Sequence, residues 1–341
     1  MLIPSFCRTP ARRIVLAPPT IALLAFASSS CGRGADAARE RLADRRDTVV
    51  VYLAASLARP FQTALDTFAA RTGAVIQRES GASLEHARKI TELHRIPDLI
   101  ALADREVFQQ LLVPTHISWY CEFATNRMVV AYTPRSRHAA DVDSTNWMKI
   151  LSRADVQVGR PDPDLAPAGY RAILTLRLAE RYYRAPGLAD RLLQNAPRRN
   201  MRANAAELAA LLQLGELDYI YDYESVAVSN GFQYVRLPRA IDLSDPSLAR
   251  VYGEVNVRVR GAAGLGSAPG RDSVTFAGQP IVFALSVPRA APHESAGQRL
   301  AGFLLSVEGR GMLRAAHLNV LDAPVLVGDS IPHDIRASVG R

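Results

Sequence analysis

Cysteine is rare in this sequence: 3 residues occur in 341, and Cys121 is the single one beyond position 31. A chain cleaved near residue 31 therefore has no internal disulfide to form, and its hydrophobic core must hold the fold alone. Long basic runs with interleaved aromatic residues are also missing, which argues against nucleic-acid binding. The formal net charge of +8 favours anionic partners only in general terms.

Recognisable catalytic motifs are missing as well. The 7 histidines show no spacing typical of metal ligands. No Ser/His/Asp arrangement and no nucleotide-binding loop stands out, and the chain has neither internal repeats nor a low-complexity tract after its N-terminal part. We therefore expect no enzyme, no cofactor and no free metal cation; an exported enzyme on a similar fold is the alternative.

A membrane-spanning segment is not expected either. The apolar stretch of residues 14–27 is too short to cross a bilayer, and Pro18 and Pro19 interrupt it. Arginines precede this stretch and serines follow it, which is the order of an export signal. We expect residues 1–31 to be a signal peptide and residues 32–47 to be a polar tether, so the protein is predicted to be exported.

The end of this signal resembles a modification site. Cys31 followed by Gly32 is similar to the lipidation site of a bacterial lipoprotein, although Ser28 stands where such sites usually carry leucine. The prediction is a protein that meets the membrane only through a lipid on Cys31. Plain secretion into the periplasm, with cleavage nearby, is the alternative.

Hydrophobic residues are plentiful, at 48% of the chain, and this length suffices for a large core and suggests two domains. Continuous apolar runs predict strands buried on both faces, and Phe61, Leu65 and Phe68 lie on one face of a predicted helix. The elements expected in the first part are strands over 48–53, 74–78 and 98–101 and helices over 60–71 and 84–93. This βαβαβ order is typical of a parallel sheet with right-handed crossovers.

The rest of the chain continues the mixture of strands and helices. A stretch rich in glycine and alanine, residues 260–272, predicts a loop. The other expected elements are strands over 127–132, 218–221, 234–237 and 280–287 and helices over 169–183, 206–214 and 295–314. The fold class predicted from this order is α/β.

Small residues stand at several junctions between a strand and a helix. Ligands of open parallel sheets bind beyond the carboxyl ends of the strands, where a helix offers unpaired backbone N–H groups and the positive end of its dipole. A small residue lets an anion reach these N–H groups, and a serine adds its hydroxyl. The junctions are AAS (54–56), ESGAS (79–83), PAG (167–169) and NA (204–205). We expect them to cradle one oxyanion; a single serine before a helix is more often only an N-cap.

These residues lie in segments that resemble the periplasmic molybdate/tungstate-binding proteins, and most closely their tungstate-type branch. The resemblance covers about residues 49–318. It rests on the order and spacing of AASLARPF, ESGASLEHARKITEL, NRMVVAYTPRS, VQVGRPDPDLAPAGYRA, AERYY, GELDYIYDYESVAVSNGFQYVRLP and GQPIVFALSVPRAAP. It implies a type II periplasmic binding protein with two lobes, each a mainly parallel sheet flanked by helices. Such proteins close on a ligand and deliver it to the permease of an ABC transporter.

The resemblance also implies which residues hold the ligand. Ser56 and Ser83 match the two serines whose hydroxyls and amides bind the oxyanion. Ala168 matches a backbone donor, and Ala205 matches another with looser alignment. Tyr221 matches a tyrosine whose hydroxyl donates to the anion.

Carboxylates distinguish this chain from the tungstate-type branch. Asp222 falls where that branch has a glutamate that reaches the metal of the oxyanion, and its side chain is one methylene shorter. Ala166 occupies the place of the other metal-reaching carboxylate. We therefore expect a tetrahedral oxyanion held by hydrogen bonds, with Asp222 bonded to an amide or hydroxyl behind it; ligation of the metal by Asp222 is the alternative. Arg171 is expected to pair with a carboxylate such as Asp162, the alternative being that it faces the anion.

The resemblance predicts a first lobe of residues 48–130 and 289–341 and a second lobe of residues 131–288. Two crossings near 130–132 and 287–289 would form the hinge. The predicted function is the substrate-binding component of an ABC importer that captures molybdate or tungstate, and the protein is predicted to be a monomer. These two ions are nearly identical in size, so hydrogen bonding does not predict which of them is preferred. A binder of another anion, such as sulfate, phosphate or a small carboxylate, and a sensory ligand-binding module are the alternatives.

Overall fold

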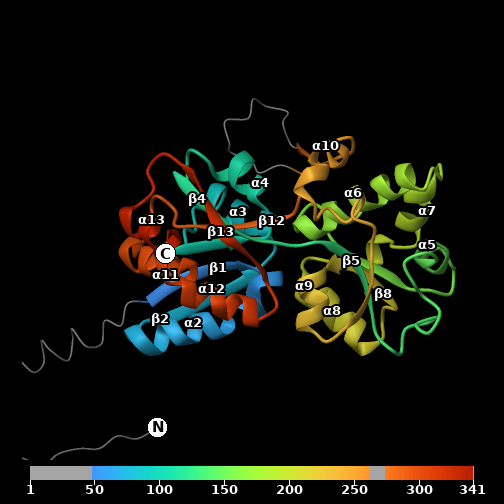
Figure 1. The fold of residues 1–341 in the computed structure, drawn as a ribbon, viewed down its shortest axis with the longest axis horizontal. Coiled ribbons are helices and arrows are strands. Elements are labelled where there is room, and N and C mark those ends of the chain that lie inside the picture. Colours follow the sequence, from blue (N-terminus) through green and yellow to red (C-terminus); the bar gives the residue numbers. More distant parts are fainter. Residues whose placement is uncertain (1–47, 261–272, 341) are drawn as a thin grey trace, which may run out of the picture. The chain divides into compact units, whose positions relative to one another are not determined.

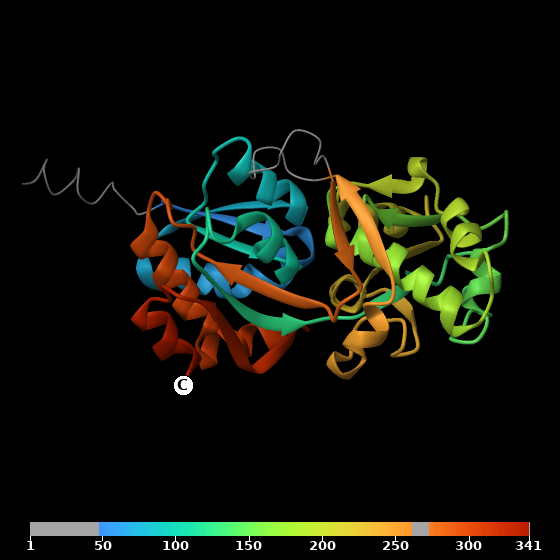
Figure 2. The ribbon, with the colours of Figure 1, turned by 90° about the horizontal axis from the view of Figure 1, so that it is seen from above.

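The computed structural model describes residues 48–260 and 273–340, which all fall in one compact unit of the chain. The expected signal peptide, Cys31 and the tether lie outside the described residues, as does most of the loop expected over 260–272. Figures 1 and 2 show two sheets, each with its own set of helices. No helix among the described residues has the length and apolarity that a membrane crossing requires.

The first sheet has six strands in the order β13-β4-β12-β3-β1-β2. Its strand β3 is apolar throughout, and all four residues of β3 and all five of β12, including Ser286, are buried, because helices cover both faces. The strands are β1 (Thr48–Ala54), β2 (Val75–Gly81), β3 (Leu99–Leu102), β4 (Trp119–Thr125), β12 (Val282–Ser286) and β13 (Asn319–Gly328).

Helices of this sheet bury one apolar face each. On α2 the three residues predicted to share a face, Phe61, Leu65 and Phe68, are all buried, and the ring of Phe61 meets that of Phe123 on β4 at 5.7 Å. The helical elements are η1 (Ala55–Leu57), α2 (Ala58–Thr72), α3 (Ser83–Thr91), α4 (Arg105–Val107), the π-helical turn η2 (Phe108–Leu112), α11 (Glu294–Leu305), α12 (Val307–Ala315) and α13 (His333–Val339).

The second sheet has five strands in the order β7-β6-β8-β5-β9. They are β5 (Met128–Tyr132), β6 (Val158–Pro161), β7 (Met201–Arg202), β8 (Tyr219–Tyr223) and β9 (Gln233–Arg236). The helical elements that accompany them are α5 (Trp147–Leu151), α6 (Pro167–Tyr182), α7 (Leu188–Gln194), η3 (Arg198–Asn200), α8 (Ala205–Leu214), α9 (Glu224–Ser229), η4 (Pro246–Leu248) and α10 (Ala249–Tyr252). A hairpin of β10 (Asn256–Arg260) and β11 (Ser273–Ala277) packs on α6, where Phe276 stacks on Tyr170 at 4.6 Å.

Both sheets are mixed, whereas we expected mainly parallel ones. The parallel pairs are β1 with β2 and β3, and β6 with β7 and β8, which are the strands that βα units connect. The other strands, β4, β12 and β13 in the first sheet and β5 and β9 in the second, make antiparallel pairs.

Two segments join the sheets: residues 126–127 between β4 and β5, and residues 278–281 between β11 and β12. They touch, since the N–H of Asn126 donates to the carbonyl oxygen of Ile281 at 3.3 Å. The crossings were expected near residues 130–132 and 287–289, several residues later in the chain. The difference arises because β5 already belongs to the second sheet and β12 already belongs to the first. Below, "first lobe" means the six-stranded sheet with its helices, and "second lobe" means the five-stranded sheet with its helices and the hairpin.

Some expected elements differ from the observed ones. The single helix expected over 295–314 is two helices, because Ser306 has an extended ψ of 164° and its side chain accepts a hydrogen bond from the N–H of Gly309, which starts α12. The strand β4 and the hairpin β10–β11 were not predicted. In β4 the sequence WYCEFAT has no clear alternation, because the strand is buried on both faces.

Candidate ligand-binding site

The four small-residue junctions surround one cavity. Both lobes contribute to its wall, which consists of Ala54, Ala55, Ser56, Gly81, Ala82, Ser83, Ala103, Ala166, Pro167, Ala168, Asn204, Ala205 and Tyr223. Four of the six predicted ligand-binding residues, namely Ser56, Ser83, Ala168 and Ala205, are therefore within one wall although up to 149 positions separate them in the chain. Their contact with a ligand stays a prediction.

The cavity is small. Its volume is about 20 Å³, which is space for about one water molecule. A compact ion fits this description better than an extended organic molecule, for which pockets of ~300–1,000 Å³ are usual.

Three helices begin at the wall of this cavity. The first turns of α3 and α6 begin at Ser83 and Pro167, and neither helix has a side chain that caps its N–H groups. On α8 the side chain of Asn204 accepts hydrogen bonds from Ala206 and Glu207 and so leaves the N–H of Ala205 outside this cap. The N–H groups of Leu84 and Gly169 already donate to the carbonyl oxygens of Leu165 and Ala166, at 3.0 and 2.9 Å. The other N–H groups at these helix starts and three helix dipoles together favour a negative ligand.

The two serines differ in their surroundings. Ser83 is almost fully buried, and its Oγ accepts a hydrogen bond of 3.1 Å from the N–H of Ala103, which leaves its own O–H hydrogen for a ligand. Ser56 lies in η1, and it lines both this cavity and an adjoining groove between α2 and α8. Both hydroxyls can therefore act as uncharged donors to an anion.

Tyr221 does not line the cavity. Its side chain is completely buried, and among the described residues its hydroxyl has no hydrogen-bond partner. Burial raises the pKa of Tyr221, and the nearby Arg160 opposes this only in part. Tyr223, two residues further along the same face of β8, lines the cavity instead, because it lies at the carboxyl end of the strand.

Asp222 does not line the cavity either, and its carboxylate bonds to the backbone. Its Oδ1 accepts a hydrogen bond of 2.8 Å from the N–H of Tyr223, and its Oδ2 has no partner among the described residues. Complete burial raises the pKa of Asp222 to about 7. Asp222 and Ile220 are two residues apart on β8 and therefore point to the same face of the sheet. Gly159, which pairs with Ile220, points toward Leu208 of α8. Asp222 therefore lies on the side of the sheet that α8 covers.

A buried charge cluster that the sequence analysis missed lies behind the cavity. Arg171 pairs with a carboxylate, as expected, but the partner is Asp104, at 2.8 Å, in place of the suggested Asp162. The hydroxyl of Tyr170 donates to the other oxygen of Asp104. A signal for Asp104 was present, because it follows the predicted strand at 98–101 as the small-residue junctions follow theirs.

The wall of the cavity itself is uncharged, since it is made of alanine, glycine, serine, proline, asparagine and tyrosine residues. Its donors are therefore dipoles, and Arg171 stands behind the wall with its charge balanced by Asp104. No group of three or more His, Cys, Asp or Glu side chains in the described part of the chain is placed to hold a metal ion. The arrangement can bind a small anion through hydrogen bonds, and it presents no nucleophile beside a general base.

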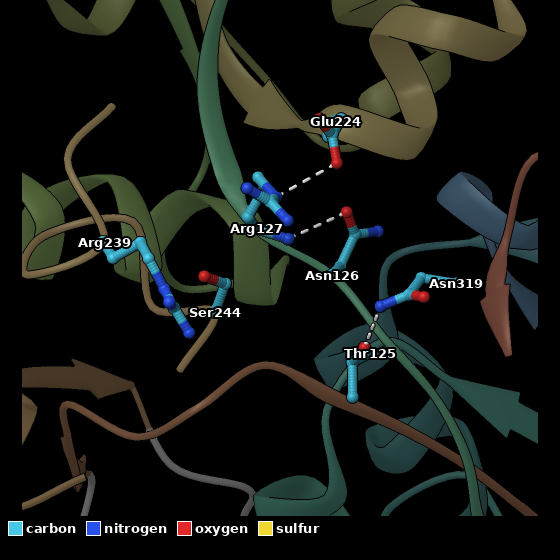
Figure 3. Close-up of a pocket in the computed structure, with 7 residues that line it drawn as sticks. All are labelled: Thr125, Asn126, Arg127, Glu224, Arg239, Ser244 and Asn319. Atoms are coloured by element: carbon cyan, nitrogen blue, oxygen red, sulfur yellow. Dashed lines mark hydrogen bonds and ion pairs between the residues drawn. The ribbon is translucent and has the colours of Figure 1, made fainter. Parts of the chain in front are cut away.

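A larger pocket lies at the chain crossing (Figure 3), and it is a poorer anion site. Its lining residues are Thr125, Asn126, Arg127, Glu224, Arg239, Ser244 and Asn319. Arg127 lies 3.1 Å from Glu224, and Arg239 lies 2.7 Å from Asp245, so both cations already have carboxylate partners. None of the predicted ligand-binding residues lines this pocket.

Comparison with known proteins shows the family of the chain. Residues 49–319 match the family described as bacterial extracellular solute-binding protein. The chain belongs to this family. A solute-binding relative from Petrotoga mobilis, described as uncharacterized, is 38% identical over 266 residues, which cover 78% of this chain and 81% of the relative. The molybdate/tungstate-binding protein WtpA of Thermococcus kodakarensis is 31% identical over 355 residues, which cover 96% of this chain and 97% of WtpA.

Solved structures share the fold of this solute-binding protein. The sulfate-binding protein SubI of Mycobacterium tuberculosis has a TM-score of 0.57 and 15% identity, with 81% of this chain and 87% of SubI covered. The periplasmic molybdate-binding protein of Azotobacter vinelandii has a TM-score of 0.52 and 14% identity, with 79% and 98% covered. The predicted fold, a two-lobed α/β protein of the type II periplasmic binding class, is thereby confirmed.

Proposed function

We propose that this solute-binding protein captures a tetrahedral oxyanion, molybdate or tungstate, between its lobes and is the binding component of an ABC importer. The observation that carries the proposal is the convergence of Ser56, Ser83, Ala168 and Ala205 on one small, uncharged cavity. The names of two relatives, both molybdate/tungstate-binding proteins of about 30% identity, support the choice of ligand.

Several weak donors together account for tight binding. One helix N-terminus contributes about 0.3–1 kcal/mol, and up to about 2 kcal/mol when it is partly buried. Each hydrogen bond to a charged group adds about 1.5–3 kcal/mol. Three helix starts and two serine hydroxyls are available here, and closure of the lobes excludes water and strengthens each of these interactions.

The proposed coordination is tetrahedral. Ala166 lines the cavity at the position where the tungstate-type branch has a carboxylate, so no ligand to the metal comes from this side. The carboxylate of Asp222 is engaged with the N–H of Tyr223, and Tyr223 is in the wall. We propose that Asp222 orients Tyr223 toward the anion and does not bind the metal itself.

The family indicates where the protein is located. Membership in an extracellular solute-binding family makes it an exported protein. We propose that it acts as a monomer, that a lipid on Cys31 anchors it to the membrane, and that it delivers its ligand to an ABC permease. A non-enzymatic role is part of the proposal, because the cavity wall offers hydrogen-bond donors and no acid–base pair.

Calorimetric titration of the purified protein with molybdate, tungstate, sulfate, phosphate and citrate tests the ligand. We expect binding of molybdate and tungstate, and much weaker binding of sulfate, because sulfate is smaller and would leave some of the donors around the closed cavity without a partner. In a parallel thermal-shift experiment, a ligand at a hundred times its dissociation constant stabilises the fold by about 2.7 kcal/mol. Binding of sulfate, phosphate or citrate alone would contradict the proposal.

A further inference from the structure

The charge cluster behind the cavity joins the two lobes. Asp104 directly follows β3 of the first lobe, whereas Arg171 belongs to α6 of the second lobe. Arg171 Nη2 lies 2.8 Å from Asp104 Oδ1, and Arg171 Nη1 donates to the carbonyl oxygen of Ala103 at 2.6 Å and to the hydroxyl of Tyr223 at 2.7 Å. One guanidinium therefore contacts residues of both lobes.

The cluster is buried and its carboxylate is fully used. The side chains of Arg171 and Asp104 are 4% and 2% exposed. Asp104 accepts hydrogen bonds from the hydroxyl of Tyr170 and from the N–H of Glu106, at the start of α4, in addition to its ion pair. Substitution of one partner of such a buried pair lowers stability strongly, because the remaining charge is buried without a compensating one.

The cluster also reaches the wall of the ligand cavity. Ala103 and Tyr223, the two groups to which Arg171 Nη1 donates, both line that cavity, one from each lobe. Arg171 itself is not in the wall, so it acts on the ligand through these two neighbours. The position of the wall thus depends on the contact between the lobes.

Separation of the lobes would expose both charges to water. In the open form Asp104 and Arg171 would each be hydrated, so the loss of one partner costs little there, whereas in the closed form it leaves a buried charge without compensation. Removal of one partner therefore destabilises the closed form and not the open one. Capture of a ligand by the open form does not involve the cluster, whereas release requires that it break.

We infer that Asp104 and Arg171 are positioning residues that form a clasp between the lobes and set the rate at which the bound anion leaves. This inference rests on the proposed function for its ligand. The clasp holds Ala103 and Tyr223 in place around the anion, and its opening accompanies the release of the anion.

The main test measures the release of radiolabelled molybdate into an excess of unlabelled molybdate. The variant Asp104→Asn keeps the size of the side chain and removes its charge, and we expect it to release molybdate at least tenfold faster with an association rate within threefold of the original. The double variant Asp104→Asn with Arg171→Met is expected to release molybdate more slowly than Asp104→Asn alone, because it leaves no uncompensated buried charge in the closed form.

A matched control exists within one lobe. Arg137 pairs with Asp218 at 2.8 Å, and both residues belong to the second lobe. The carboxylate of Asp218 is 8% exposed and so resembles that of Asp104, whereas Arg137 is 54% exposed. Asp218→Asn is expected to leave the release rate unchanged. The milder variant Tyr170→Phe removes only the hydroxyl that donates to Asp104, and it is expected to accelerate release about two- to fivefold, which keeps the test decisive where Asp104→Asn does not fold.

A second measurement separates this inference from the proposed function. We expect the ligand-free Asp104→Asn and Tyr170→Phe variants to have a larger radius of gyration in solution scattering than the original protein and Asp218→Asn. If no oxyanion binds but this difference is present, the clasp stands and the proposed ligand is wrong. If molybdate binds and its release rate is unchanged in both variants, or if nothing binds and the radius is unchanged, the clasp is overturned.

Discussion

The hydroxyl oxygen of Ser83 accepts a hydrogen bond of 3.1 Å from the backbone N–H of Ala103, so two residues of the cavity wall hold each other in place. Ser83 starts α3 and Ala103 follows β3, and neither has more than 2% of its surface exposed. Ser83 thus stabilises the first lobe as well as offering a hydroxyl to the ligand, whereas no such bond involves Ser56 among the described contacts.

This difference predicts two effects for Ser83→Ala. The affinity for molybdate is expected to fall by about 1–3 kcal/mol, because a hydrogen bond to a charged group is lost. The free energy of unfolding without ligand is expected to fall by a similar amount, because the buried N–H of Ala103 loses its acceptor. Calorimetry and urea unfolding measure the two effects; unchanged stability would contradict the structural role.

Ser56→Ala is the matching variant with a single effect. Its affinity for molybdate is expected to fall by about 1–3 kcal/mol as well. Its free energy of unfolding without ligand is expected to stay within about 0.5 kcal/mol of the original, the range of substitutions that break no buried contact. The same two measurements apply, and unchanged affinity in both serine variants would refute the assigned site.

Gly169 lies where the start of α6 passes close to the end of β6. A Cβ on this residue would be 2.5 Å from the carbonyl oxygen of Pro161, so Gly169→Ala must shift the first turn of α6. We expect a loss of about 1–3 kcal/mol in unfolding free energy, together with weaker molybdate binding. Gly311→Ala on α12 is the control, because no atom lies within 4 Å of its Cβ position, and we expect it to be neutral or slightly stabilising.

Asp222 predicts an unusual dependence of stability on pH. Burial raises its pKa to about 7, above the value of about 3.9 expected in the unfolded chain. The folded state therefore binds more protons between these values, and the contribution of Asp222 to stability falls as the pH rises from about 4 to about 7. Asp222→Asn removes this contribution, so the difference in unfolding free energy between the original and the variant should change by up to about 1.4 kcal/mol per pH unit in that window. A constant difference across urea titrations at several pH values would contradict the assignment.

His86 predicts the opposite slope. Burial lowers its pKa to about 4, and a ring nitrogen bonds to the carbonyl oxygen of Leu53 at 3.0 Å. The unfolded state, with a histidine pKa of about 6.5, binds more protons between pH 4 and 6.5, so stability is lost as the pH falls through this range. In His86→Gln this acid-induced loss should be smaller than in the original protein. The same urea titrations at several pH values measure this loss. It should be clearest in Asp222→Asn, because that variant lacks the opposite pH dependence of Asp222.

Much of the fold was predictable from local patterns. The alternation of strands and helices from Thr48 to Ala101, and the shared face of Phe61, Leu65 and Phe68, are both confirmed by the structure. Strand pairing was less predictable, because the direction in which β12 joins the first sheet depends on where the chain returns from the second lobe. The break at Ser306 was also missed, since a helical pattern continues on both sides of it.

The candidate site divides in the same way. Small residues at the starts of helices indicated Ser56, Ser83, Ala168 and Ala205, because a strand end followed by a helix is visible in the sequence. Which tyrosine of β8 lines the cavity was not visible, since Tyr219, Tyr221 and Tyr223 share one face and only their distance from the strand end separates them.

The sequence by itself determined the local elements and the uncharged donors at four helix starts, because each of these depends on residues close together in the chain. The scarcity of cysteine is likewise a property of the sequence alone. The tertiary structure alone decided that the four junctions share one cavity, that Tyr223 lines it, and that Asp104 meets Arg171 behind it. These are contacts between residues up to 149 positions apart, and they depend on how two sheets pack, which no local pattern encodes.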